Sequence, residues 1–157
     1  MTTIHLKTLI KSPVEEVFNI SRNIDFHITS AKKTKEKAIA GKTSGLIKLG
    51  ETVTWRGKHF GMYLTHQSLI SRYKYPNTFT DEMIRGYFKT FNHQHIFNTI
   101  SYGTEMIDKL VYEVPHGVLG KLFNEIVLKK HLTKFLVLRN QAIQLYLENK
   151  NLIKKTL

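Results

Sequence analysis

The chain has 157 residues, 41% of them hydrophobic, and a mass of 18.3 kDa, which suits a single domain, 1–157, with one core. Lys and Arg number 24 against 12 Asp and Glu, giving a formal net charge of +12, and this balance excludes an acidic disordered chain. The absence of cysteine excludes disulfides, thiolate metal sites and cysteine nucleophiles. No apolar run approaches the roughly 20 residues of a membrane span, and the start lacks a signal-peptide core, so we expect a cytoplasmic protein.

The first elements are a strand and two short helices. Residues 2–11 alternate between apolar and polar side chains, which predicts a strand. Ser12 and Pro13 then precede acidic residues, and this order is typical of a helix start in which Ser12 caps the helix and Glu15 completes a capping box. A second short helix is predicted over 23–31.

The middle of the chain consists of short extended runs rich in Val, Ile, Thr, Tyr and Phe. These runs predict six strands, over 35–40, 48–56, 59–74, 78–86, 88–100 and 103–113. Turn signals separate them at Arg56-Gly57-Lys58, Pro76-Asn77, Gly86 and Tyr102-Gly103. With the first strand, the sequence predicts about seven antiparallel strands.

The last segment carries apolar residues at three- and four-residue spacings from Leu119 to Tyr146, which predicts one long amphipathic helix. The order of elements indicates an α+β domain in which a curved sheet buries one face against this helix. If the helix does not fill the concave volume, an apolar cavity remains between the sheet and residues 118–150.

Several motifs resemble those of a known superfamily. They include Ser12-Pro13-x-Glu15-x-Val17-Phe18 after the first strand and Pro115-x-Gly117-x-Leu119-Gly120 before the last helix. Others are the run from Gly45 to Gly61, Phe79-x-Asp81-Glu82-Met83, Gly86-x-Phe88-Lys89, His93-x-His95-x-Phe97 and Gly103-Thr104-x-Met106-x-Asp108.

With the order of elements, these motifs make nearly the whole chain resemble the START/Bet v 1-like (SRPBCC) helix-grip superfamily, most closely its small bacterial ligand-binding or cyclase/dehydrase-like branch. The resemblance implies a helix-grip fold with a ligand cavity. It transfers no catalytic residue, because members range from lipid carriers and hormone receptors to cyclases, dioxygenase subunits and partner-binding modules.

Polar residues stand among aromatic ones on two neighbouring strands. One face of the 88–100 strand carries Phe91, His93, His95 and Phe97, and the matching face of the next strand carries Thr104, Met106, Asp108, Leu110 and Tyr112. A tight turn at Ser101-Tyr102 would place His95 opposite Asp108, and a two-residue slip would place Phe97 there instead. The first register also sets His93 opposite Leu110.

This histidine–aspartate pair has three interpretations: a structural hydrogen bond, orientation of a ligand, or proton transfer with Arg85 stabilising an oxyanion. His93-x-His95 also has the spacing of metal ligands, with Asp108, His59 or His66 as the third. No further cluster fixes the remaining ligands, so we expect no metal and no cofactor.

We therefore expect a binding module for a small hydrophobic or amphipathic molecule, with one alternative as a cyclase- or dehydratase-type enzyme that uses His95, Asp108 and Arg85. The expected ligand-binding residues are Trp55, Phe91, His93, His95, Phe97, Met106, Asp108, Tyr112, Leu119 and Phe123. A second alternative is a basic interaction module for an acidic partner, an anionic membrane surface or nucleic acid. The positive charges do not form one stripe, so no specific nucleic acid is expected. Exposed edge strands are compatible with a monomer or a homodimer.

Overall fold

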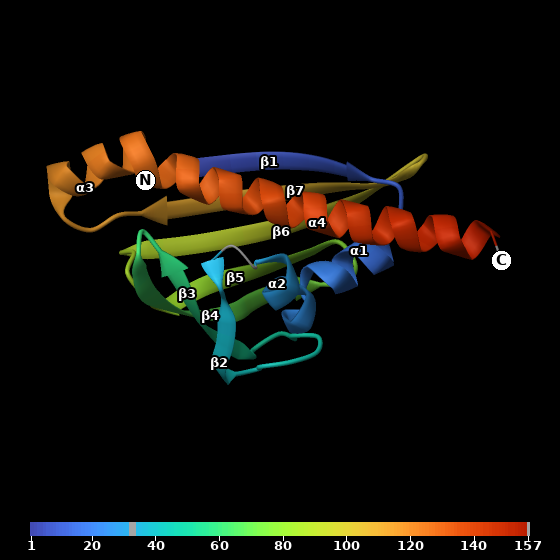
Figure 1. Ribbon diagram of the computed structural model, residues 1–157, viewed down its shortest axis with the longest axis horizontal. Coiled ribbons are helices and arrows are strands. Elements are labelled where there is room, and N and C mark those ends of the chain that lie inside the picture. The colour runs from blue at the N-terminus through green and yellow to red at the C-terminus, as the bar shows by residue number, and fades with distance from the viewer. Residues whose placement is uncertain (32–33, 157) are drawn as a thin grey trace.

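The computed structural model describes residues 1–31 and 34–156, which form a curved antiparallel sheet of seven strands gripping a C-terminal helix (Figure 1). The sheet has the order β1-β7-β6-β5-β4-β3-β2, with β1 Thr2–Ile10, β2 Lys37–Gly41, β3 Thr52–His59, β4 Met62–Lys74, β5 Thr78–Arg85, β6 Thr90–Ile100 and β7 Gly103–Glu113. The helical segments are α1 Val14–Ser21, α2 Ile24–Ser30, α3 Gly117–Phe123, the π-helical η2 Asn124–Leu128 and α4 Lys129–Thr156. The predicted α+β helix-grip architecture is confirmed.

Helix α1 begins one residue later than the capping-box prediction requires. Pro13 is the N-cap, with an extended ψ of 147°, and no side chain caps the helix. The Ser12 hydroxyl donates instead to Glu16 Oε2 at 3.5 Å, so the capping box between Ser12 and Glu15 was wrong. The carbonyl oxygen of Pro13 accepts hydrogen bonds from the backbone N–H groups of Glu16 and Val17, so the backbone itself provides these hydrogen bonds in the first turn.

The hairpin between β3 and β4 turns at Phe60-Gly61, and the turn predicted at Arg56-Gly57-Lys58 was wrong. Phe60 and Gly61 both have positive φ, 51° and 81°, as a two-residue hairpin turn requires. Gly57 instead pairs with Leu64 inside the strand ladder. A Cβ on Gly57 would lie 2.8 Å from Glu36 Cγ, so this glycine lets the Glu36 side chain approach the sheet.

The long C-terminal helix is confirmed, with a π-helical segment near its start. Figure 1 shows α4 running across the sheet, with α1 and α2 beside it. The π-helical segment holds Asn124, which is buried and accepts a hydrogen bond from Tyr112 Oη at 2.6 Å. The side-chain amide of Asn124 donates to Thr2 Oγ1 at 2.9 Å, so this irregular turn connects the helix to β1 and β7.

Among the residues that the structure describes, the core has two apolar clusters on the face of the sheet that α4 covers. One surrounds Phe18 and includes Phe97, Met106 and Ile143, and the other surrounds Tyr112 and Leu110. Among the described residues, no helix is both long enough and apolar enough to cross a membrane.

Candidate functional site

A cavity of about 210 Å³ lies between the sheet and α4, where the two core clusters meet. The Phe18 cluster contributes Ile47, Val53, Ile70 and Phe79 to its wall, and the Tyr112 cluster contributes Leu110 and Leu136. Partly buried aromatic side chains complete the apolar wall: Trp55, Phe88, Phe91 and Phe135. The cavity is therefore mostly apolar, as a site for a small molecule requires.

Histidines are concentrated in this cavity. Six of the eight in the chain line it: His27, His59, His66, His93, His95 and His131. Two acidic residues, Asp81 and Glu36, line it as well. The polar side chains form two groups, one on β5 and β6 and the other around Glu36.

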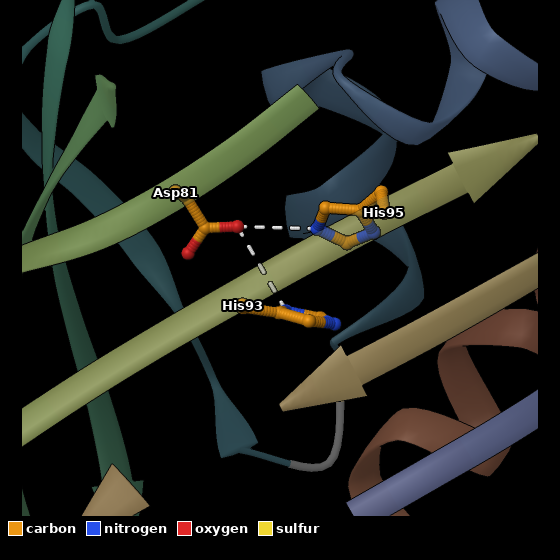
Figure 2. Close-up of side chains that lie close together, drawn as sticks. All are labelled: Asp81, His93 and His95. Atoms are coloured by element: carbon orange, nitrogen blue, oxygen red, sulfur yellow. Dashed lines mark hydrogen bonds and ion pairs between the residues drawn. The ribbon is translucent and has the colours of Figure 1, made fainter. Parts of the chain in front are cut away.

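The first group is the Asp81 cluster, composed of Asp81, His93 and His95 (Figure 2). The β5–β6 register sets Asp81 directly opposite His93, and the strand period of two returns the side chain of His95 to the same face. His95 Nε2 lies 3.1 Å from Asp81 Oδ2, and His93 Nδ1 lies 3.8 Å from the same oxygen. All three side chains border the cavity.

Asp108 lies beneath the two histidines and is fully buried. Its Oδ1 lies 2.9 Å from His93 Nε2 and 2.9 Å from His95 Nδ1, although the second contact lacks the alignment of a hydrogen bond. Asn140 Nδ2 on α4 donates to Asp108 Oδ2 at 2.7 Å, and Arg139 Nη1 lies 3.7 Å from Oδ1. The Asp108 carboxylate therefore contacts the nitrogen of each imidazole that points away from Asp81, and it connects both rings to α4.

These contacts set the protonation of the cluster. Burial alone would raise the pKa of Asp81, but its hydrogen bond with His95 and the charges of the histidines outweigh burial and lower it to about 2. The same balance holds the pKa of Asp108 well below its usual range. Burial and the charge of His95 lower the pKa of His93, whereas the two carboxylates overcome burial and raise the pKa of His95. Both carboxylates are therefore ionised at neutral pH, and His95 binds a proton more readily than His93 does.

The second group is the Glu36 cluster, composed of His27, Glu36, His59 and His131. Glu36 Oε2 lies 2.6 Å from His27 Nε2, and Glu36 Oε1 lies 3.6 Å from His59 Nε2. His59 Nδ1 continues the chain to His131 Nε2 on α4 at 3.0 Å. Burial opposes the charge of Glu36, but its hydrogen bonds with the two histidines lower its pKa to about 2. The Trp55 ring lies 4.2 Å from that of His27 and connects this cluster to the apolar wall.

The predicted β6–β7 register is confirmed: His95 pairs with Asp108 and His93 with Leu110. Of the residues expected to bind a ligand, Trp55, Phe91, His93 and His95 line the cavity. Those that are buried but lie outside its lining are Phe97, Met106, Asp108 and Tyr112. The inward faces of both strands are as predicted. Phe97, Met106 and Tyr112 belong to the core clusters instead of the cavity wall, and Asp108 lies behind His93 and His95.

Two other residues expected to bind a ligand and the catalytic candidate Arg85 also lie outside the lining of the cavity. Leu119 and Phe123 are 77% and 45% exposed on α3, and neither lines the cavity. The amphipathic pattern of this segment therefore does not face the cavity. Arg85 is exposed at the end of β5 and also lies outside the lining, so it is not placed to stabilise an oxyanion there. The arginines that do line the cavity are Arg22 and Arg139.

The contributions of Glu36, His27, His131 and Asn140 were missed by sequence reasoning. Each comes from an element remote in sequence from the central strands. The signal available was a pair of polar residues, Arg139-Asn140, within an apolar helical stripe, because a buried polar residue on such a stripe requires a partner on the opposing surface.

Fold and cavity together define a helix-grip protein, and solved structures with the same fold superpose on most of the chain. A protein of Thermus thermophilus, TTHA0849, superposes with a TM-score of 0.71 at 15% identity, over 90% of this chain and 97% of its own. Protein Ms6760 of Mycobacterium smegmatis gives 0.71 at 13% identity, over 94% and 92%.

The major latex-like protein 151 of Panax ginseng gives a TM-score of 0.64 at 16% identity, over 93% of this chain and 97% of its own. No family model and no curated protein matches the sequence. At these identities the likeness establishes the fold and leaves the ligand to be argued from the site.

Proposed function

We propose that this protein binds a small amphipathic molecule in the cavity, with the polar head of the ligand at the Asp81 cluster. The observation that carries the proposal is a mostly apolar cavity into which Asp81, His93 and His95 converge from two neighbouring strands. This combination, with few polar groups to fix orientation and apolar surface to supply affinity, is typical of small-molecule sites.

The size of the cavity limits the ligand. An engineered apolar cavity of about 150 Å³ takes up benzene, and typical ligand pockets begin near about 300 Å³. A cavity of about 210 Å³ therefore favours a compact molecule of one or two rings over a long-chain lipid.

The chemistry of the Asp81 cluster indicates the head group. Asp81 presents an ionised carboxylate whose side chain is 19% exposed, so it can accept a hydrogen bond from a ligand. The neighbouring imidazoles can donate or accept according to their protonation. A hydroxyl group, which both donates and accepts, satisfies this arrangement better than an ionised carboxylate, which has no hydrogen to donate to Asp81.

Trp55 supplies a direct test, because it is the only tryptophan and it lines the cavity. We expect a ligand in the cavity to change the fluorescence of this residue. We would titrate the protein with compact ring-containing alcohols, together with matched carboxylic acids, and expect saturable changes for the alcohols.

A cavity-filling variant separates this site from other surfaces. Leu136→Phe enlarges a buried side chain of α4 that lines the cavity, and Leu145→Phe makes the same change where the side chain is 62% exposed on the same helix. We expect Leu136→Phe to weaken binding at least about 10-fold, a loss of about 1.4 kcal/mol, and Leu145→Phe to leave it unchanged. Equal binding by both variants, or no saturable response from any member of the panel, would contradict the proposal.

A further inference from the structure

We propose that Asp81, His93 and His95 (Figure 2) form a mononuclear site for a zinc-like divalent metal ion, with an open coordination position toward the cavity. The sequence favoured no metal and offered Asp108, His59 or His66 as a third ligand beside the two histidines. The structure brings Asp81 to that position instead. The inference does not depend on the proposed ligand, because the metal ion alone tests it.

The donor atoms have the separation that a metal ion requires. One donor atom from each residue lies within 4.8 Å of the other two. Asp81 Oδ2 is 3.1 Å from His95 Nε2 and 3.8 Å from His93 Nδ1. A tetrahedral zinc ion with bonds of about 2.0–2.1 Å separates its ligand atoms by about 3.3 Å, so small side-chain movements would complete the site.

The hydrogen bond of His93 to Asp108 matches the outer contact of a metal ligand, and His95 Nδ1 lies at the same distance from that carboxylate without hydrogen-bond alignment. Metal-binding imidazoles commonly donate their second nitrogen to a carboxylate, which fixes the ring and its tautomer. Here Asp108 Oδ1 lies 2.9 Å from His93 Nε2 and 2.9 Å from His95 Nδ1, the two nitrogens that do not face Asp81. Asn140 in turn donates to Asp108 Oδ2 at 2.7 Å. One buried carboxylate thus orients His93 by a hydrogen bond and contacts His95 as well.

Charge and access are also suitable. Asp81 and Asp108 contribute two negative charges and Arg139 contributes one positive charge, so the site is net negative when both histidines are neutral. A divalent cation is favoured by such a site. Asp81, His93 and His95 line the cavity whereas Asp108 does not, so three ligands come from the protein and the fourth position faces the space for a small molecule.

The competing arrangement is a metal-free bridge in which the imidazolium of His95 lies between two carboxylates. Calorimetric titration of the chelator-treated protein with Zn²⁺ distinguishes the metal site from the metal-free bridge. We expect one ion per chain for the wild type and no stoichiometric binding for Asp81→Asn or His93→Gln.

His5→Ala removes an exposed histidine and His131→Ala removes a cavity histidine outside the cluster, and both should keep wild-type binding. Asn140→Leu, which removes the donor to Asp108, should weaken binding about 10–100-fold as a positioning residue does. Nitrogen NMR of the wild-type imidazoles needs no variant: Zn²⁺ should shift His93 and His95 and leave His5 unchanged. No stoichiometric binding by the wild type, full binding by Asp81→Asn, or unshifted His93 and His95 resonances would overturn the proposal.

Discussion

Replacing Asp108 by asparagine tests whether one buried carboxylate holds the polar network together. The side chain is fully buried, and its oxygens contact His93 Nε2 at 2.9 Å, His95 Nδ1 at 2.9 Å and Asn140 Nδ2 at 2.7 Å. Asparagine keeps the shape but removes the charge, and its amide group must face one of these nitrogen donors. His95 and Arg139 also lose the charge that compensates them.

The expected cost follows from this burial. Removing one partner of a buried ion pair costs about 3–5 kcal/mol, a large share of the roughly 5–15 kcal/mol that stabilises a domain. With a urea m-value of about 2 kcal/mol per molar, the unfolding midpoint of Asp108→Asn should fall by about 1.5–2.5 M. Urea titration at neutral pH followed by circular dichroism measures it.

Glu105→Gln is the matched control on the same strand. Glu105 points to the opposite face of β7 and pairs with the exposed Lys7 at 2.7 Å, so its replacement should move the midpoint little. The pKa of Asp108 is lowered by folding, so its stabilisation is present above the unfolded value of about 3.9 and is lost as pH falls. The gap between wild type and Asp108→Asn should therefore narrow in acid. A midpoint for Asp108→Asn equal to that of wild type or of Glu105→Gln would refute this reasoning.

Three other predictions concern the core and the histidines. The pKa of His95 is raised and that of His93 lowered, so NMR titration of the metal-free protein should show His95 protonating above about 6.5 and His93 below it; coincident curves would contradict the network. The stabilisation from His95 is complete below the unfolded value and is lost as pH rises through its folded pKa, whereas that from His93 is lost as pH falls. Tyr112→Phe leaves the buried Asn124 Oδ1 without its 2.6 Å donor and should lower the free energy of unfolding in urea by about 1–3 kcal/mol. In the wild type, burial raises the pKa of the Tyr112 phenol to about 12, so absorbance should show that it resists alkaline titration. Phe97→Ala, at a fully buried ring, should cost about 3–5 kcal/mol in thermal or urea unfolding, and a loss below about 1 kcal/mol would show that the core is packed differently.

The β6–β7 pairing could be predicted because it is local. A tight turn at Ser101-Tyr102 fixes one register, and strand alternation then sets the inward face of both strands. His95 opposite Asp108 follows from the turn and the period of two alone. The order of elements likewise predicts the helix-grip architecture, because a continuous antiparallel sheet can bury only one face against a single long helix.

The complete site could not be predicted because it depends on contacts between remote elements. Asp81 joins the two histidines only through the β5–β6 register, and its facing could not be decided from β5 alone. Glu36 reaches His59 because Gly57 leaves room for the Glu36 side chain. In the sequence, this glycine between two basic residues was interpreted as a turn. The exposure of Leu119 shows the same limit, since helical periodicity identifies an apolar face without saying what covers it.

Native mass spectrometry tests the central claim, that the cavity holds a small molecule, most directly. Wild type, Leu136→Phe and Leu145→Phe would each be incubated with a small-molecule extract of the expression host and sprayed without organic solvent. We expect wild type and Leu145→Phe to carry one noncovalent adduct above 18.3 kDa, and Leu136→Phe, whose cavity is filled, to lack it. A bare 18.3 kDa wild-type chain, or the same adduct on Leu136→Phe, would contradict the account.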